Sequence, residues 1–436
     1  MTKRCFSALF SLVIFLTIPV ISLRALSLSD ITSGITDIFS PTIDNNEGGT
    51  SFRSLLLPFG GRAESMGNAY TGLCDDISYL NSNPAAGALQ NETQLSLFHN
   101  TWIADSKLET LAYTTRLGFL PHFGLGAYAS CFYVPFTEYD IFGEKAASSY
   151  YVEAITAVNA SYNFFAGYDF KGMSVGANIK AGWRNVPNFT NNDVNTAVPG
   201  SGFSQSSFAI MADIGLMFQF NFLKYFASRE PNVRIGLTAQ NLGIAITGFG
   251  DKLELDAGLP TLFSAGMSVR FIKPFTLAIG FTQPMNLMKP QIYLLPYIEL
   301  GASIQFTSFL SLLAGLQLKG SKPTLSAGLE FELTKVRVNL NYSLDFTTSL
   351  APINRFSLST KLQLGDRGRK KTRDEVDEIY KAGLIYYQNA EWQKAIDTWE
   401  QALKIDKRFD PAKLGIKSAQ HQIDMFEEIK KSLMLD

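Results

Sequence analysis

The stretch FGGRAESMGNAYTGLCDDISYLNSNPAA, residues 59–86, decides how the rest of the chain is organised. It holds four glycines, an Asp-Asp pair and an Asn-Pro turn, so it favours neither a packed helix nor a regular strand. This composition predicts a compact segment with several forced backbone turns, held by hydrogen bonds. Because it stands between a secretion-type N-terminus and a long series of alternating strands, it is predicted to plug the interior of a β-barrel.

Apolar and polar residues alternate after this stretch, most cleanly in 173–180, 233–240 and 336–343. A β-sandwich produces that alternation with its polar face outward, and a membrane barrel produces it with its apolar face outward. About fourteen strands are predicted, with approximate centres at Phe98, Ala112, Tyr128, Val158, Ala177, Asp213, Leu237, Ala265, Ile279, Leu300, Ala314, Ala327, Leu340 and Ser359.

The links between these strands favour the barrel. Odd-to-even links are mostly long, as in 132–149, 186–206 and 243–260, whereas even-to-odd links are mostly tight. Outer-membrane barrels have short turns on the periplasmic rim and long loops on the other, and a sandwich predicts no such asymmetry. An even number of strands would return the C-terminus to the periplasm.

Composition agrees with a membrane barrel. Only 18% of the 436 residues are charged and 13% are aromatic, which is an apolar balance for a soluble enzyme of this length. After the N-terminus no apolar run reaches the roughly 20 residues of a spanning helix, so strands would have to cross the membrane. The net charge of −1 gives no indication of a nucleic-acid partner.

The N-terminus is predicted to be a targeting segment. Lys3 and Arg4 precede an uncharged run over 5–23, which is typical of a signal peptide covering residues 1–25. The alternative is a retained anchor, since the run is almost long enough to span a membrane. Residues 26–50 are expected to form an irregular lead-in. Cys74 and Cys131 then remain, either unpaired or joined in a bridge from plug to wall.

The pattern Gly-Arg-Ala at 61–63, Met-Gly-Asn-Ala-Tyr-Thr-Gly at 66–72, Asp75-Asp76 and Asn83-Pro84-Ala resembles the N-terminal hatch of the FadL-type long-chain fatty-acid transporters. It is also similar to related spirochaete outer-membrane proteins and to PorV-like barrels of a secretion system. The resemblance implies a hatch over 51–92 and an all-β outer-membrane barrel over 93–365. The residues that it assigns to the hatch are Gly61, Arg62, Gly67, Asn68, Asp75, Asp76, Asn83 and Pro84.

The resemblance further implies uptake of hydrophobic compounds, in particular long-chain fatty acids, by a barrel in contact with outer-membrane lipid. In that family the ligand sits beside the hatch and leaves sideways through a kinked third strand. Here the third candidate strand carries Gly124, Gly126 and Pro135, and such residues weaken a strand ladder.

Two arginines, Arg234 and Arg337, occupy polar-facing positions of their strands. They are candidates to pair a ligand carboxylate in the lumen. The alternative is charge balance within the lumen, against Glu330 or Glu332.

The C-terminal part changes to a helical period. Residues 366–373 read as a basic linker, and 374–436 resemble a single tetratricopeptide repeat followed by a further helix near 411–433. The residues at that repeat's spacing are Gly383, Tyr386, Ala395, Trp399 and Ala402. Small residues would let two helices approach, with Tyr386 and Trp399 filling the space between them. Because a lone repeat buries little apolar surface, this periplasmic unit is expected to dock on the barrel rim, on a second copy or on a protein partner.

No catalytic pattern accompanies these features. The three histidines, His99, His122 and His421, lack metal-ligand spacing to the cysteines, and no nucleophile elbow, P-loop or dinucleotide fingerprint is present. The Asp75-Asp76 pair is expected to cap backbone N–H groups or to pair with Arg62. The sequence therefore predicts neither enzyme activity nor a metal or cofactor. It leaves uptake, a protein-binding scaffold and a water-filled porin as functions, and a hatch argues against the porin.

Overall fold

The computed structural model describes residues 49–433 apart from 119, 121, 140–141, 166, 168–169, 189, 192–195, 198–201, 226–229, 250–251, 291–293, 321 and 348–352. The signal peptide predicted over 1–25 and nearly all of the lead-in over 26–50 lie outside the described residues.

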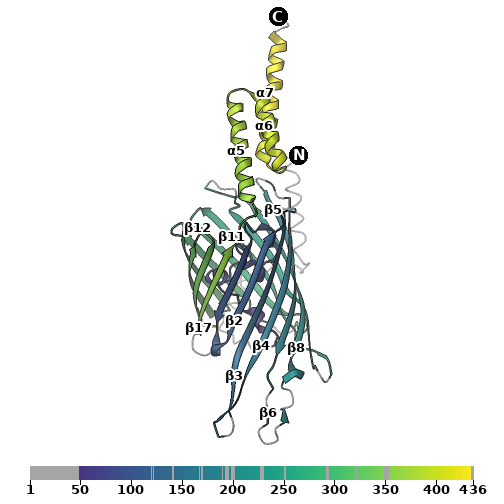
Figure 1. Cartoon of the computed structure of the whole chain (residues 1–436), viewed down its shortest axis with the longest axis vertical. Helices are drawn as coiled ribbons and strands as arrows, with labels where there is room; N and C mark the ends of the chain where they lie inside the picture. Colours follow the sequence, from purple (N-terminus) through teal and green to yellow (C-terminus); the bar gives the residue numbers. More distant parts are fainter. Residues whose placement is uncertain are drawn as a thin grey trace, which may run out of the picture.

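Within the described residues, fourteen antiparallel strands close into one barrel (Figure 1). The last strand pairs with the first, from Gln94 opposite Gln363 to Asn100 opposite Ser357. This closure excludes the sandwich and confirms the predicted strand number, and each predicted centre lies in a strand. In order around the wall the strands are β1 (Gln94–Thr101), β2 (Lys107–Arg116), β3 (Phe123–Tyr139), β4 (Lys145–Phe164), β5 (Phe170–Asn185), β8 (Ser207–Phe220), β9 (Val233–Thr247), β11 (Pro260–Ile272), β12 (Phe275–Asn286), β13 (Tyr297–Gln305), β14 (Leu310–Lys319), β15 (Lys322–Glu332), β16 (Val336–Asp345) and β17 (Ile353–Gln363).

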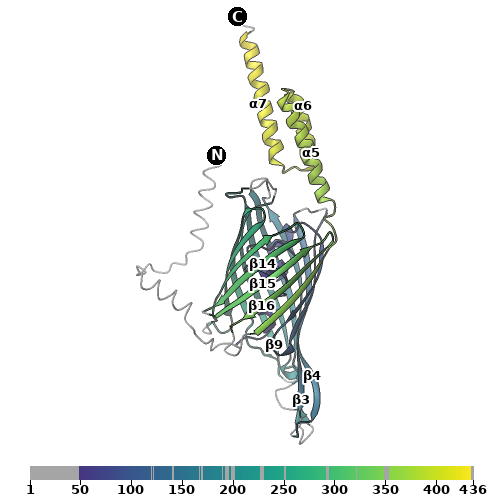
Figure 2. The same ribbon diagram turned by 90° about the vertical axis from the view of Figure 1, so that its left-hand side faces the viewer.

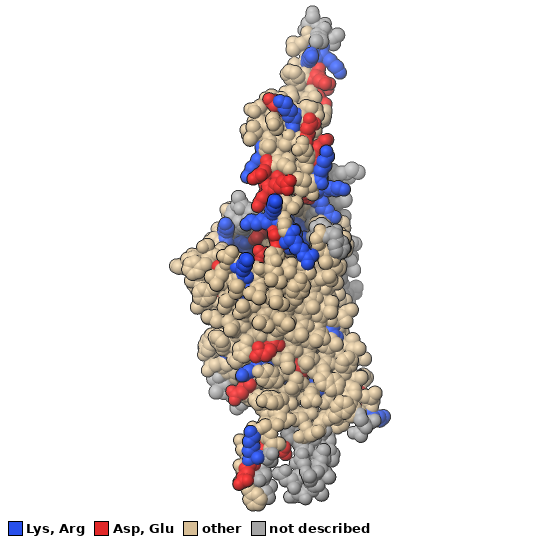
Figure 3. All heavy atoms as spheres, viewed as in Figure 1, with Lys and Arg blue, Asp and Glu red and all other residues tan. Residues whose placement is uncertain are grey.

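Because side chains alternate along each strand, the apolar ones face outward and the polar ones face inward. On β5, Ile179 is 71% exposed on the outer face, whereas its neighbours Asn178 and Lys180 are buried inside. In the space-filling view a broad band of the visible wall carries no charged side chain (Figure 3). A closed barrel with this surface satisfies its backbone internally and matches the apolar interior of an outer membrane.

The two rims differ in their connections. The links that leave the 2nd, 4th and every further even strand, counted around the wall, are mostly short turns, such as 273–274 between β11 and β12 and 333–335 between β15 and β16. They define the short-turn rim. The opposite, long-loop rim carries the two-stranded β6 (Thr190–Asn191) and β7 (Thr196–Ala197), together with β10 (Glu254–Leu255) and η4 (Gly202–Gln205).

The long loop predicted over 132–149 is wrong, because β3 and β4 continue past the barrel as a paired hairpin (Figure 2). Its aromatic and β-branched residues favour strand pairing over an irregular loop.

Residues 49–92, here called the inner segment, run through the barrel from one rim to the other. Ser51 N–H donates to Gly258 O at the long-loop rim (3.1 Å), and Thr93 N–H donates to Gly365 O beyond the other end (2.9 Å). Four short helical turns interrupt it: η1 (Arg53–Leu56), α3 (Arg62–Ser65), α4 (Tyr79–Ser82) and η2 (Pro84–Leu89).

Glycines line the wall where it meets the inner segment. A Cβ on Gly236 would overlap the Thr71 carbonyl, and one on Gly315 would overlap the Gly67 backbone. Strand register sets many of these glycines beside one another, as with Gly301 opposite Gly315. The wall and the inner segment therefore touch backbone to backbone, which only residues without a side chain allow. This glycine belt comprises Gly124, Gly126, Gly176, Gly215, Gly236, Gly266, Gly301, Gly315 and Gly328.

The gap predicted in the third strand at Gly124, Gly126 and Pro135 is not present. β3 pairs without interruption with β2 along Lys107–Arg116 and with β4 from Phe123 to Glu138, and its register shifts only between Glu138 and Tyr139. The two glycines have another cause, because side chains there would overlap Gly87 and Tyr79 of the inner segment.

Three helices follow the barrel and stand on its short-turn rim (Figures 1 and 2). They are α5 (Arg369–Gln388), α6 (Trp392–Ile405) and α7 (Asp410–Leu433). No helix in the described part of the chain is long and apolar enough to cross a membrane. Most of the predicted linker over 366–373 belongs to α5, because the Asp366 carboxylate accepts from Gly368 N–H and Lys370 N–H and so starts the helix.

Trp399 is the centre of this helical unit. It lies so close to Gly383 that a Cβ there would overlap the indole, and its Nε1–H donates to Tyr380 O (3.1 Å). Ala395 and Ala402 are buried beside it. The packing role predicted for Tyr386 is wrong: that ring is 37% exposed, and Tyr380 and Tyr387 flank the indole instead. The reason is helical period, since 380, 383 and 387 share one face of α5 and 386 lies at its side.

The helical unit meets the turn between β2 and β3. Burial and then the positive charges of Arg408 and Arg116 lower the pKa of His122 in that turn, while Asp406 acts in the opposite direction. Because this arrangement favours the neutral imidazole, the contribution of His122 to docking is fully present above the usual histidine pKa of about 6.5 and is lost as the pH falls below it.

We expect a spin label at Lys407 to become more mobile as the pH is lowered from about 7 to about 5 in the reconstituted protein. His122→Gln, which cannot titrate, should abolish this change, and His421→Gln on α7 should preserve it. Equal mobility at both pH values in the wild type would show that His122 does not control docking.

We also expect Gly236→Ala and Gly315→Ala each to lower the free energy of unfolding by about 1–3 kcal/mol, because the added methyl must displace backbone. Gly118→Ala is the matched control, since nothing lies within 4 Å of a Cβ there. Denaturant unfolding of the purified barrel measures the difference. Equal midpoints for all three variants would contradict the close packing.

Candidate functional site

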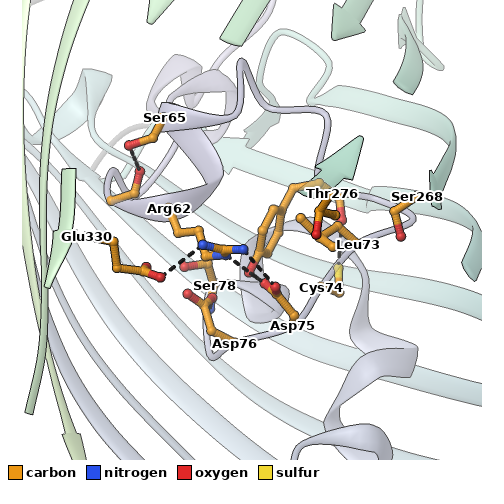
Figure 4. A network of polar contacts seen from close by, with 12 residues as sticks. Arg62, Ser65, Leu73, Cys74, Asp75, Asp76, Ser78, Ser268, Thr276 and Glu330 are labelled. Atoms are coloured by element: carbon orange, nitrogen blue, oxygen red, sulfur yellow. Dashed lines mark hydrogen bonds and ion pairs between the residues drawn. The ribbon is translucent and has the colours of Figure 1, made fainter. Parts of the chain in front are cut away.

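Arg62 is the centre of a buried charge cluster between the inner segment and the wall (Figure 4). Its Nε and Nη2 donate to the two carboxylate oxygens of Asp75, both at 3.0 Å, and its Nη1 donates to Glu330 Oε1 on β15 at 2.9 Å. Tyr70 O–H also donates to Asp75 (2.7 Å). The pairing expected between Arg62 and the Asp-Asp pair is thus confirmed for Asp75. The bidentate geometry fixes the fold of the inner segment, and the third bond ties it to the wall.

Asp76 makes a second charged contact with the wall. One carboxylate oxygen accepts from Ser78 N–H (2.8 Å), which caps the following turn, and the other pairs with the Lys361 ammonium on β17. Both side chains are almost fully buried, so each charge depends on the other for its solvation.

Glu64 makes the third charged contact. It accepts from Ser357 O–H at 2.8 Å and forms an ion pair with Arg355 Nε at 3.4 Å, both on β17. The inner segment and the wall therefore each supply both positive and negative partners to these ion pairs. The segment contributes Arg62, Asp76 and Glu64, and the wall contributes Glu330, Lys361 and Arg355.

Neutral amides hold the opposite side of the inner segment. Asn159 and Asn178, on β4 and β5, donate to Pro84 O and Leu80 O, and Gln240 on β9 donates to Asn81 O (3.0, 3.2 and 2.8 Å). These bonds satisfy carbonyls that no helix or strand pairs, which an irregular segment inside a membrane barrel requires.

Asn83 and Pro84 form the turn that this network surrounds. Asn83 Nδ2 donates to Thr71 O (3.0 Å) and Leu216 O (3.1 Å), while its Oδ1 accepts from Ala85 N–H (3.1 Å). One side chain thus joins two parts of the inner segment to β8, with Pro84 at the first position of η2.

Gly61, Gly67 and Asn68 all have φ between 61° and 68°, the left-handed region. The consecutive Gly67 and Asn68 reverse the chain after α3, and Asn68 Nδ2 contacts Gln317 Oε1 on β14 (3.4 Å). Gly and Asn are the residue types that adopt this conformation at least cost.

Arg234 and Arg337 both face the lumen but lie in different contacts. Arg337 Nη2 donates to Glu332 at 2.6 Å, which is the charge balance that the sequence left as an alternative. Arg234 donates to Leu73 O at 2.7 Å and so belongs to the support of the inner segment. A role for either in pairing a ligand carboxylate stays a prediction.

A cavity of about 170 Å³ lies between the inner segment and the long-loop rim. Most of the residues that line it are polar, among them Asp345, Gln317 and the buried Glu299, and its apolar residues include Leu55, Leu57 and Trp102. One carboxylate oxygen of Glu299 contacts Thr282 and Gln317 at 3.3 Å each. The cavity can therefore receive a small molecule that carries polar groups beside an apolar part.

The two cysteines among the described residues are free, with Cys74 buried in the inner segment and Cys131 partly buried on β3. Cys74 Sγ donates to Tyr70 O (3.0 Å). In the part of the chain that the structure describes, no group of three or more His, Cys, Asp and Glu could hold a metal ion.

Sequence reasoning missed the wall side of this site. Lys361 and Arg355 of the wall were not singled out, nor was their neighbour Glu64 in the inner segment, although Lys361 is a charged residue in an inward position of the last strand. The glycine belt had a visible signal, since glycine recurs at inward positions of successive strands.

We expect Asp76→Asn and Lys361→Met each to destabilise the folded barrel by about 3–5 kcal/mol, because each leaves one buried charge without its partner. The double variant should lose clearly less free energy of unfolding than the two single variants together. A double-mutant cycle from denaturant unfolding measures this coupling. Lys252→Met with Glu254→Gln, an exposed pair at the rim, is the control cycle. Strict additivity of the buried pair would disprove its anchoring role.

Comparison with known proteins identifies the family of this chain. The model of the family described as uncharacterised protein family UPF0164 matches residues 30–367. A UPF0164 protein of Treponema pallidum (strain Nichols) is 27% identical over 391 residues, which cover 88% of this chain and 85% of the relative. A second from the same organism is 27% identical over 407 residues, covering 87% and 77%.

Among solved structures, the chain is similar to the CymD monoaromatic hydrocarbon channel, with 16% identity and a TM-score of 0.49 over 70% of this chain and 97% of that one. It is also similar to the Ralstonia pickettii toluene transporter TbuX, with 13% identity and a TM-score of 0.48 over 70% of this chain and 98% of that one. At these levels of identity, the substrates of those proteins cannot be assigned to this chain. The family model covers the inner segment and the whole barrel, and the chain belongs to the UPF0164 family.

Proposed function

We propose that the protein is an outer-membrane channel for the uptake of small hydrophobic compounds, in which the inner segment is the hatch. The observation that carries the proposal is the cavity beside the inner segment at the long-loop rim. In this proposal the long-loop rim faces the outside and the helical unit stands in the periplasm, as short turns on that rim favour.

The cavity has the size for such a compound, and its mostly polar lining includes an apolar part. Its 170 Å³ exceeds the roughly 150 Å³ of an engineered cavity that holds benzene. An aromatic ring or a short alkyl segment would contact Leu55, Leu57 and Trp102, while a polar end would reach Gln317 or Glu299. Long-chain fatty acids, the substrate that the sequence resemblance predicts, would place only part of their chain here, and the rest would extend toward the rim.

Passage through the barrel requires the hatch to move. The inner segment is held by three ion pairs and by hydrogen bonds, with no covalent bond to the wall among the described residues. Non-covalent contacts of this kind allow local opening without unfolding of the barrel.

Uptake of radiolabelled oleate and of a radiolabelled alkylbenzene tests the proposal, in cells that carry the protein in the outer membrane and lack their own route. We expect Ser264→Phe, which fills the cavity, to lower uptake roughly tenfold or more, because overpacking costs about 1–3 kcal/mol of binding. Ala302→Phe on the outer wall is the matched control and should leave uptake unchanged.

Uptake of neither compound by correctly inserted wild-type protein would overturn the proposal. Uptake of the alkylbenzene alone would retain the channel and remove fatty acids as its substrate.

A scaffold that binds a periplasmic protein is the second candidate, and the end of α7 favours it. Phe426, Ile429 and Leu433 are 59%, 55% and 72% exposed on that helix, which is more apolar surface than a simple cap needs. Deleting residues 369–436 separates the two functions: a channel keeps its uptake, whereas a scaffold loses its partner.

A further inference from the structure

Three reactive side chains form a row on the outer face of the barrel. Strand register sets His99 on β1 opposite Glu109 on β2, and Glu109 opposite Cys131 on β3. His99 Nδ1 lies 2.6 Å from Glu109 Oε1, and the two side chains are 36% and 44% exposed on the side that faces away from the lumen. They take no part in the site described above.

Their neighbours place this pair at membrane depth. Toward the short-turn rim the next outward positions are the exposed Leu97 and Leu111. Toward the long-loop rim the next outward positions are the polar Thr101 and Lys107, and at the same level the neighbouring strands carry the exposed rings of Phe356 and Tyr342. Aromatic and polar side chains together are typical of the girdle of a membrane barrel. The pair therefore lies at the edge of the girdle, next to the hydrocarbon, where an exposed carboxylate is unfavourable unless something polar covers it.

The pair stands at the side of a groove of about 630 Å³. Small residues form its floor, including Ala129, Cys131 and Ala154, whereas Leu97, Leu111 and Leu358 form its sides. A floor of small side chains between leucines has the shape and the chemistry that an acyl chain occupies.

A second groove across the barrel provides the comparison. It also has about 630 Å³ and is lined by residues such as Met267, Leu300 and Ala302, none of which titrates. An apolar groove between outward side chains is thus a general feature of this wall, and the His–Glu pair is particular to the first one.

We propose that this first groove is a binding site for a membrane lipid whose head group carries hydroxyl groups. With Nδ1 bonded to Glu109, the outward atoms of the pair are His99 Nε2 and Glu109 Oε2, for which the described residues supply no partner. Glu109 Oε2 accepts hydrogen bonds, and His99 Nε2 donates when the imidazole carries both protons and accepts when only Nδ1 is protonated. A hydroxyl group donates and accepts at once, so sugar or glycerol hydroxyls satisfy both atoms while the acyl chain fills the groove.

Native mass spectrometry of the full chain tests this site, in bilayers that contain equal amounts of monogalactosyl diacylglycerol and phosphatidylcholine with the same acyl chains. Phosphatidylcholine has no hydrogen-bond donor in its head group, so it can fill the groove without satisfying Glu109. We expect the wild type to retain the galactolipid, with roughly tenfold preference over phosphatidylcholine.

Two variants locate the site. His99→Leu with Glu109→Leu keeps the groove and removes the polar pair, so the preference should disappear. Ala154→Trp fills the first groove and should remove the bound lipid, whereas Ala302→Trp fills the second groove and should leave the preference unchanged. Because both tryptophans replace outward alanines of the wall, they are matched for any effect on folding.

An unchanged preference in the His99, Glu109 double variant would overturn the proposal. So would a mass of two chains that depends on the pair, since a second copy would then cover the groove in place of a lipid.

Discussion

An irregular chain inside a membrane barrel must find a partner for every buried polar group, and the rest of this structure depends on how that constraint is met. The inner segment has only short helical turns, so several of its carbonyls find their partners on the wall and not within it. The wall supplies the partners through side chains, as Asn178 does for Leu80 O and Ser268 for Gly72 O. The polar inner face of the strands is therefore specific to this segment, whereas a water-filled lumen would need only polarity.

These hydrogen bonds also require the backbone of the inner segment to lie close to the wall. Side-chain amides reach the inner segment only if its backbone lies near the wall, and the glycine belt allows that distance. The belt and the hydrogen bonds thus require one another: a methyl group at Gly215 would meet Asn83, whose amide joins the segment to β8. Mutations at the belt should consequently act on the polar network as well as on packing.

Much of the fold could be read from local pattern, and the errors have physical causes. Alternation located each strand centre, because one polar and one apolar face is a property of each strand alone. The position of the Arg62–Asp75 contact was also accessible, since both residues belong to one short motif. The partners of Asp76 and Glu64 were not, because Lys361 and Arg355 lie almost 300 residues away and their distance depends on barrel closure. The interpretation of Gly124 and Gly126 was wrong for a similar reason. Glycine weakens a strand ladder when the strand is considered alone, but here it makes room for the inner segment.

The contacts of the inner segment are unequal around the barrel, and this inequality bears on how a hatch could open. The three ion pairs described above reach β15 and β17, through Glu330, Lys361 and Arg355. On the side of β4, β5, β8 and β9 it is held mostly by neutral amides. The charged Glu153 and Arg234 on that side bond only to backbone groups, Ser54 N–H and Leu73 O. A charged hydrogen bond is roughly twice as strong as a neutral one, and separating buried ions leaves charges that water must reach. If the segment moves, the side held without these ion pairs yields at lower cost, and the side of β15 and β17 acts as the hinge. A passage that opened in this way would run along β4 to β9 and away from the β15 to β17 wall.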